Sequence, residues 1–376
     1  MNQIFITNIT IEKVRHLKNI SIPLSETCMK PLILTGKNGS GKTSVVEALA
    51  EYLENICKKK LKRSRAGLDV QFNIDIGNLI PMKEKYHYIL AYYSADRIFE
   101  AEKPQHVEKV SLKDSYGMRE FPGKDFVKYL LDLKMTEALA RNNGKTEKAD
   151  EIKVWFQKLE QLLKDIFDDE SVKLMFDEET FEFHIMQQGK EPFDFNTLSS
   201  GYQAVLDIVL DIMMRMQSQI QRSFDFNISG IVLIDEMETH LHLELQKHIM
   251  PLLTMIFPNI QFIVTSHSPF ILNSLRDAVI YDLENHVLVE EGLNNVPYDG
   301  IVEGYFNADK MSDNLKEKFK RYKKLVEKKV LSDDEMREIA ELELYLDEIP
   351  DYLAIDISAE YQRMKLQFMK REDIDG

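Results

Sequence analysis

The sequence has little that would mark a secreted, membrane-spanning or nucleic-acid-coating protein. Its 376 residues include only two cysteines, Cys28 and Cys57, which build neither a disulfide framework nor a CxxC metal pair. Basic residues are fewer than acidic ones, 48 against 63, and the net charge is −15. This balance argues against a surface that coats nucleic acid or anionic membrane as a whole, so any such contact would need a local basic patch.

Long apolar segments are also missing. No run approaches the roughly 20 residues that cross a bilayer, and the N-terminus lacks a basic segment followed by an apolar one, so we expect no signal peptide. Apolar residues still make up 44% of the chain, which is enough for a sizeable core. We therefore expect a soluble, cytoplasmic protein that has no membrane partner.

Hydrophobic periodicity predicts an α/β fold. Alternating residues over 4–24 predict N-terminal antiparallel strands, and the apolar run 32–34 predicts a buried parallel strand that leads into a helix. Further on, helices over 202–222 and 240–256 are predicted to flank a strand at 231–234. The expected parts are an N-terminal lobe (1–97), a mainly helical insert (98–195), a second α/β lobe (196–300) and a charged helical tail (301–376).

A phosphate-binding loop is predicted at residues 36–43, which match G-x-x-x-x-G-K-[ST]. Its glycines let backbone N–H groups surround an anion, while Lys42 reaches the β- and γ-phosphates and Thr43 binds Mg²⁺. An ordinary glycine turn with a chance lysine is the alternative, but here the match lies between a predicted strand and helix. The expected ATP-binding residues of this loop are Gly36, Lys37, Asn38, Gly39, Ser40, Gly41, Lys42, Thr43 and Ser44.

An acidic pair follows the predicted strand at 231–234. Asp235 is placed to bind the Mg²⁺ ion, together with Thr43, and Glu236 to take a proton from the attacking water. By itself this pattern also describes a buried strand that ends in solvated acids. Its pairing with the phosphate-binding loop favours the catalytic interpretation.

Two further motifs come in a fixed order. Ser199, Ser200 and Gly201 stand at the start of a long apolar helix, where a second anion could bind. His267 follows a strand that ends near Thr265, and a lone histidine there is more often a structural hydrogen-bonding residue. Its place after the loop, the serine–glycine segment and the acidic pair makes it a catalytic candidate.

The order of these four motifs resembles that of the ABC-type ATPases, in which the segment 198–203 is similar to the signature motif and His267 to the switch histidine. The segments 235–242 and 265–269 resemble the narrower RecF-like and OLD-like branch, often described as AAA-family, and most of all the PtuA-type antiphage defence ATPases. The resemblance covers about 1–97 and 195–295. It implies an ABC-ATPase head that binds ATP and Mg²⁺ and forms a head-to-tail homo-oligomer, with each signature closing over the other subunit's ATP.

Some residues depart from the family pattern. Ser200 and Tyr202 stand where many ABC proteins have glycine and glutamine, and Met237 and Leu243 replace expected prolines. No Q-loop glutamine follows the strand that ends near Tyr93; the segment 94–97 takes its place. Whether Asp96 or Arg97 substitutes for it stays open at this level.

The resemblance implies an ATPase that senses or regulates a separate effector, a nuclease, in bacterial antiphage defence. No intrinsic nuclease is expected, because the roughly 80 residues after position 295 show no acidic cluster on a convincing strand. The alternatives are a DNA-maintenance ATPase of the RecF or Rad50 kind and, third, a transporter subunit.

Two basic segments could bind a partner: the first could contact nucleic acid or nucleotide, and the second nucleic acid or an acidic partner protein. Residues 58–65 hold six bases, and the predicted tail helix around 315–326 carries many lysines beside an apolar stripe. That stripe is formed by Leu315, Phe319, Tyr322 and Val326. In both segments the bases could instead be a solvated surface, or in the tail they could pair with the acidic helix that begins after Ser332.

Overall fold

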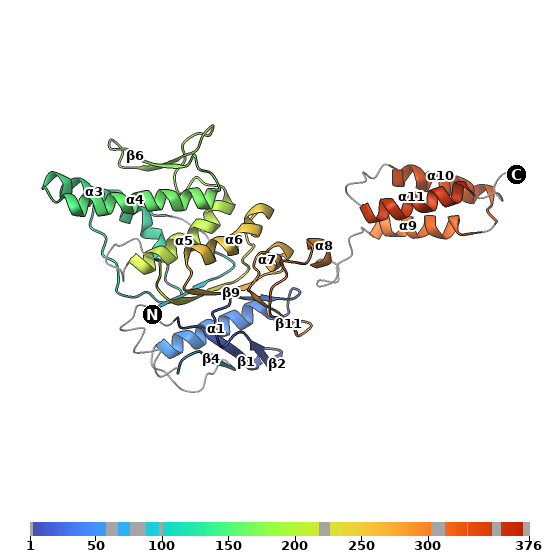
Figure 1. Ribbon diagram of the computed structural model, residues 1–376, viewed down its shortest axis with the longest axis horizontal. Helices are drawn as coiled ribbons and strands as arrows, with labels where there is room; N and C mark the ends of the chain where they lie inside the picture. The colour runs from blue at the N-terminus through green and yellow to red at the C-terminus, as the bar shows by residue number, and fades with distance from the viewer. Residues whose placement is uncertain are drawn as a thin grey trace. The chain divides into compact units, whose positions relative to one another are not determined.

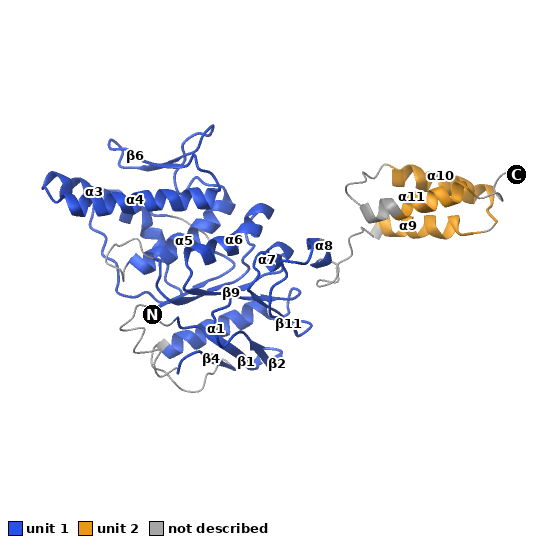
Figure 2. Ribbon diagram, in the orientation of Figure 1, with its two compact units in different colours: residues 1–301 blue, residues 302–376 orange. Residues whose placement is uncertain are grey.

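The computed structural model describes residues 3–57, 67–75, 88–97, 101–217, 226–301, 313–328, 330–347 and 355–370. The chain divides into two compact units, 1–301 and 302–376 (Figure 2). The three parts expected within 1–300 therefore belong to one unit. The basic run 58–65 lies outside the described residues. In the ranges described, no helix is both long and apolar enough to cross a bilayer.

A six-stranded sheet forms the centre of the first unit (Figure 1). In spatial order its strands are β11 (Val287–Val289), β10 (Val279–Asp282), β3 (Leu32–Thr35), β9 (Ile260–Thr265), β8 (Gly230–Ile234) and β5 (Ile89–Tyr93). The strands from β10 to β5 run parallel, and β11 is antiparallel at one edge. Because parallel strands end at the same edge, the segments that follow β3, β8, β9 and β5 meet there.

Helices and a second sheet cover this central sheet. On one side, α1 (Lys42–Cys57) packs between it and an antiparallel sheet of β2 (Leu17–Pro23), β1 (Ile6–Val14) and β4 (Leu68–Phe72). On the other side, α5 (Ser200–Gln217) contacts β5, and α6 (Leu243–Ile256) lies beside α5 (Figure 1). This architecture confirms the predicted α/β head with N-terminal antiparallel strands and a parallel core.

The segment between β5 and α5 is mainly helical, as predicted. It contains η1 (Pro122–Asp125), α3 (Phe126–Asn142), α4 (Thr146–Phe167) and the hairpin β6 (Lys173–Phe176) to β7 (Phe183–Met186). Gly144, at φ +73°, makes the turn between α3 and α4 at the predicted break. The short helix α7 (Pro269–Asn273) lies between β9 and β10 in the chain, and α8 (Tyr298–Gly300) follows β11.

Two helix starts differ from the prediction. α5 begins at Ser200 rather than at residue 202, so Ser200 and Gly201 lie in its first turn and Ser199 directly precedes it. α6 begins at Leu243 rather than at residue 240. The cause is a turn in which His240 has φ +67° and the His242 ring accepts a hydrogen bond from the N–H of Leu245 as the N-cap.

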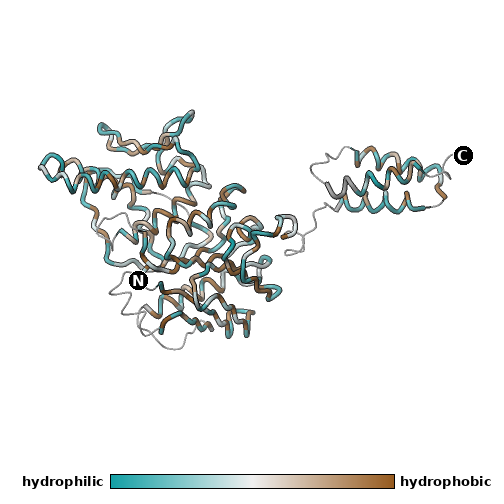
Figure 3. Tube along the Cα trace, viewed as in Figure 1, coloured by the Kyte–Doolittle hydropathy of each residue, from teal (hydrophilic) through white to brown (hydrophobic). Residues whose placement is uncertain are grey.

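The second unit consists of α9 (Asp313–Val326), α10 (Asp333–Asp347) and α11 (Ile355–Met369). The predicted stripe on α9 is buried by the tail's own helices: Phe319, Tyr322 and Val326 belong to the core and Leu315 packs against it. The rest of α9 is strongly hydrophilic (Figure 3). Two of its bases pair within the unit, Arg321 with Glu338 at 2.6 Å and Lys323 with Glu360 at 2.9 Å. Lys328, just after α9, pairs with Glu335 at 2.8 Å.

Candidate functional site

The phosphate-binding loop connects β3 to α1 at the shared strand edge. Gly36, Gly39 and Gly41 have φ values of +134°, +86° and +100°, a region that residues with a side chain rarely adopt. A Cβ on Gly41 would lie 2.8 Å from Leu17 Cδ1 and 3.4 Å from the His16 ring. The loop therefore needs glycine for its own backbone and for the close approach of the β1–β2 turn.

Lys42 is held inside this loop. Its Nζ donates to the carbonyl oxygens of Gly36 at 2.7 Å and Lys37 at 3.1 Å, and only 7% of the residue is exposed. Burial lowers the pKa of Lys42, while the nearby carboxylates of Glu238, Glu236, Asp235 and Asp282 act to raise it. A lysine that is charged, desolvated and surrounded by acids can bind a phosphate as a point charge.

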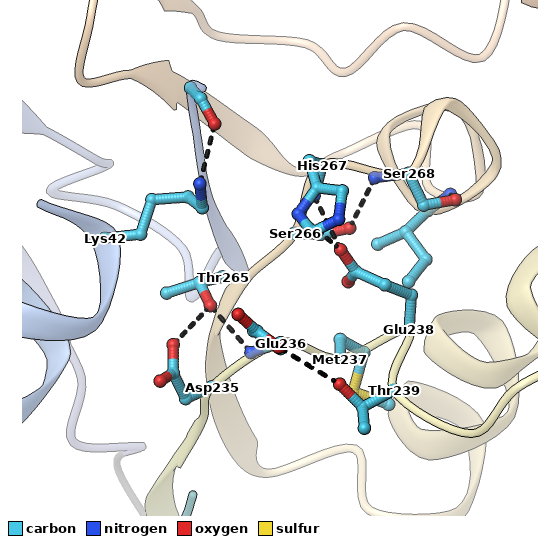
Figure 4. Close-up of polar contacts among 12 residues, drawn as sticks. Lys42, Asp235, Glu236, Met237, Glu238, Thr239, Thr265, Ser266, His267 and Ser268 are labelled. Carbon is cyan, nitrogen blue, oxygen red and sulfur yellow. Dashed lines mark hydrogen bonds and ion pairs between the residues drawn. The ribbon is translucent and has the colours of Figure 1, made fainter. Parts of the chain in front are cut away.

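The acidic pair lies at the end of β8, and Thr265 at the end of β9 connects to both its members (Figure 4). The Thr265 hydroxyl donates to Asp235 Oδ1 at 2.6 Å and accepts the backbone N–H of Glu236 at 2.7 Å. Asp235 is 2% exposed. One hydroxyl thus orients the expected Mg²⁺ ligand and the backbone of the expected base together.

His267 does not contact Glu236 but a neighbouring carboxylate. Its Nδ1 lies 3.0 Å from Glu238 Oε1, and its backbone N–H donates to the same oxygen at 2.8 Å (Figure 4). Glu236 has φ +47°, and its Oε2 accepts a bond from Thr239 Oγ1 at 3.4 Å. Glu238 is a residue that sequence reasoning missed, although it belongs to the segment 235–242 that carried the family resemblance.

The segment in the Q-loop position places its two polar residues differently. Asp96 is exposed, whereas Arg97 is 8% exposed and donates to the backbone carbonyls of Asp235 at 2.9 Å, Glu236 at 3.2 Å and Met237 at 3.1 Å. Burial lowers the pKa of Arg97. No local pattern indicates this contact, because it joins residues about 140 positions apart.

The signature segment presents its serines to solvent. Ser199 and Ser200 are exposed, while Gly201 is buried, and a Cβ on it would lie 2.9 Å from Leu245 Cδ1. In the described part of the chain no hydrogen bond or ion pair joins residues 199–201 to the loop at 36–44. Within the chain, therefore, the loop, the acidic pair and His267 come together, and among the described residues no hydrogen bond or ion pair joins the signature to them.

The residues present fit ATP and Mg²⁺. Three buried oxygens near this edge have no hydrogen-bond partner among the described residues: Thr35 Oγ1, Ser40 Oγ and Glu238 Oε2. The described residues hold no cluster of three or more His, Cys, Asp or Glu that could bind a metal alone. Mg²⁺ commonly takes one or two protein oxygens and completes its shell with phosphate and water. Thr43, which is exposed, and Asp235 are the residues that would hold it.

Comparisons with known proteins show which families this chain is similar to. A family model described as "AAA domain, putative AbiEii toxin, Type IV TA system" matches residues 106–273, which include the signature, the acidic pair and His267. The crystal structure of an SMC head bound to the C-terminal winged-helix domain of ScpA is similar over 78% of this chain and all of its own, with 14% identity and a TM-score of 0.44.

Curated relatives match different shares of the chain. The Septu protein PtuA of Bacillus mycoides is 28% identical over 74% of this chain and 40% of its own length. The Retron Ec83 probable ATPase of Escherichia coli is 31% identical over 38% of this chain and 27% of its own. RecF of Rickettsia prowazekii is 36% identical over 18% of this chain and 23% of its own.

The matches thus span less than half the length of each of these relatives. The chain carries a P-loop ATPase domain of the AAA and ABC type, homologous to PtuA, the retron ATPases and RecF.

Proposed function

We propose that the chain binds and hydrolyses ATP with Mg²⁺ in a head-to-tail pair, and that it thereby regulates a separate effector, a nuclease, in antiphage defence. The observation that carries the proposal is the convergence of Lys42, Asp235 and Glu236 on one sheet edge, with unpartnered buried oxygens beside them. The similarity to PtuA and the retron ATPases supports the defence setting.

The loop residues 36–44 hold the nucleotide. Backbone N–H groups at positive-φ glycines and the positive end of α1 attract the phosphates, and Lys42 exchanges its two carbonyl acceptors for phosphate oxygens. Mg²⁺, when bound through Thr43 and Asp235, supplies charge neutralisation at the phosphates.

Glu236 takes the proton from the attacking water. His267 contributes through its position beside Glu238, since Nδ1 held at 3.0 Å leaves Nε2 as the ring atom that can face a ligand. The backbone N–H of Glu236 is hydrogen-bonded to Thr265, and that of His267 to Glu238. Because both backbones are held in place, little reorganisation of the site accompanies the reaction.

The signature acts on a second copy of the chain. Ser199 and Ser200 are exposed at the N-terminus of an 18-residue helix, where hydroxyls and a positive helix end can meet the phosphates bound by a partner. The absence of a bond to the chain's own loop, within the described residues, suits such sharing between subunits.

A DNA-maintenance ATPase of the RecF or Rad50 kind is the second candidate, favoured by the match to RecF. The insert argues against an arm of the Rad50 kind, because α4 has 22 residues and so reaches only about 33 Å at 1.5 Å per residue.

One experiment separates the two roles. The native gene and its neighbours, expressed in a phage-sensitive bacterium, should lower plaque counts, and the Lys42→Ala variant should remove that protection. Unchanged plaque counts, together with sensitivity of a deletion strain to DNA damage, would instead support the maintenance role. In parallel, the purified chain should release phosphate from Mg-ATP, and Lys42→Ala should not.

A further inference from the structure

Arg97 holds the turn that carries the proposed base. Its guanidinium donates to three successive backbone carbonyls, those of Asp235, Glu236 and Met237, and also to that of Ser94 at 3.3 Å. The turn needs such support because Glu236 has φ +47°, which is unfavourable for a residue with a side chain. A planar guanidinium presents several donors in fixed directions, whereas a lysine has one donor nitrogen and cannot span the same carbonyls.

Asp207 lies on α5, about two turns after Ser200, and is 2% exposed. Burial and Asp211 raise its pKa, and Arg97 is the group that acts to lower it. Conversely, Asp207 is the strongest of the carboxylates that favour the charged form of Arg97. Asp207 on α5 and Arg97 after β5 therefore attract each other electrostatically.

The two groups are not joined by a hydrogen bond. Arg97 Nε and Asp207 Oδ1 are both buried, and neither has a hydrogen-bond partner within the described part of the chain. Asp211, one turn further along α5, shows the contrast: it accepts bonds from Arg215 Nε at 2.7 Å, Tyr93 Oη at 2.7 Å and the N–H of Gly123 at 3.0 Å. Both carboxylate oxygens of Asp211 thus accept hydrogen bonds, as is usual for a buried acid, whereas Asp207 Oδ1 has no partner in the described part of the chain.

We propose that Arg97 is a positioning residue for Glu236, and that Asp207 makes this positioning depend on α5 and therefore on engagement of the signature at Ser199 and Ser200. A small shift of α5 changes the attraction between Asp207 and Arg97, and Arg97 transmits the change to three carbonyls of the catalytic turn. The inference rests on the proposed hydrolysis of ATP at this site.

The first part of the test compares the full-length wild type with Arg97→Lys. ATP affinity should stay within about threefold, because Arg97 does not belong to the phosphate loop, while kcat should fall by about 10- to 100-fold from misplacement of the base. Arg141→Lys, an exposed substitution on α3, is the matched control and should leave both quantities unchanged. An unaltered kcat for folded Arg97→Lys would overturn the positioning role.

The second part is a double-mutant cycle. Asp207→Asn keeps the shape and removes the charge; it should lower kcat by itself and cause no further loss in the Arg97→Lys background. Asp132→Asn, which changes another buried acid located in the insert, should be additive with Arg97→Lys. Additive effects of Asp207→Asn and Arg97→Lys would overturn the coupling. A wild type that binds ATP without releasing phosphate would overturn the proposed hydrolysis, and the positioning role with it.

Discussion

The Thr265 hydroxyl at the end of β9 donates a 2.6 Å hydrogen bond to Asp235 Oδ1 at the end of β8. Thr265 Oγ1 also accepts a hydrogen bond from the backbone N–H of Glu236. One fully buried hydroxyl on β9 therefore contacts both acids that follow β8. This contact is possible because β8 and β9 are parallel neighbours and their carboxyl ends coincide. It makes Thr265 the residue on which the geometry of the acidic pair depends.

Thr265→Val should therefore lower the free energy of unfolding and slow the hydrolysis of ATP. The change keeps the shape but leaves the N–H of Glu236 without its acceptor and Asp235 without a donor, which costs about 1–3 kcal/mol of unfolding free energy. Urea unfolding and phosphate release measure the two effects. Thr265→Ser retains the hydroxyl and is the control; if serine is as damaging as valine, the methyl packing matters and the hydrogen bonds do not.

Glu236→Gln should separate ATP binding from hydrolysis. The amide keeps the size of the side chain but cannot accept the proton, so hydrolysis should slow by about 10²–10⁴ while binding persists. Size-exclusion chromatography with ATP should then show an accumulated pair. Unchanged turnover would remove Glu236 as the base and make His267, together with Glu238, the next residue to test.

A mixture of Ser199→Arg and Lys42→Ala proteins tests sharing of sites between subunits. Each variant alone should be inactive: the first because an exposed bulky cation blocks the signature, the second because ATP binding is lost. In an equal mixture about half of the pairs contain one copy of each variant, and each such pair has one of its two composite sites intact. Roughly a quarter of the wild-type rate should therefore return. No recovery from properly folded variants would contradict the shared site. Gly201 is less suitable, because a side chain there would meet Leu245 and the His240 carbonyl.

Asp207→Asn should also change how stability depends on pH. Burial raises the pKa of Asp207 from 3.8 to about 7. The folded chain then holds this proton more tightly than the unfolded chain, so the stability that Asp207 contributes is fully present below about pH 4 and is lost as the pH rises through about 7. The asparagine side chain does not ionise, so the variant does not lose stability in this way. Its Tm at pH 8, relative to that at pH 5, should exceed the wild-type value, whereas equal Tm profiles would contradict the raised pKa.

The structure reduces the number of basic tail residues that are free to bind a partner. Arg321 and Lys323 are engaged with Glu338 and Glu360, whereas the exposed Lys320 and Lys324 make no ion pair in the described part of the tail. Reversing Lys320 and Lys324 to Glu should weaken binding to the effector at low salt while the tail stays folded, and the difference should shrink at high salt. Arg321→Glu is the comparison, because it should lower the Tm of the tail. Equal effector binding at low salt would show that these lysines are only a solvated surface.

Local signals in the sequence determined much of this protein. The glycine pattern at 36–43, the apolar strand before Asp235 and the order of the motifs predicted a P-loop ATPase fold, since each depends on residues a few positions apart. The α3–α4 break at Gly144 and the stripe on α9 were equally visible, because helix periodicity and glycine turns are local properties. The missed start of α6 came from a turn at His240 whose positive φ no periodic pattern reports.

Only the tertiary structure decided which groups meet. Arg97 donates hydrogen bonds to the turn after β8, and Glu238 pairs with His267. Thr265 is hydrogen-bonded to both Asp235 and Glu236. Acidic residues of α10 and α11 form ion pairs with part of the basic face of α9. Each contact joins residues far apart in the chain or on different elements, and strand order and helix packing create it. Sequence patterns show which residue types are present and on which element, but a side chain acquires a specific partner only when separate elements are brought to the same edge of a sheet or the same face of a bundle.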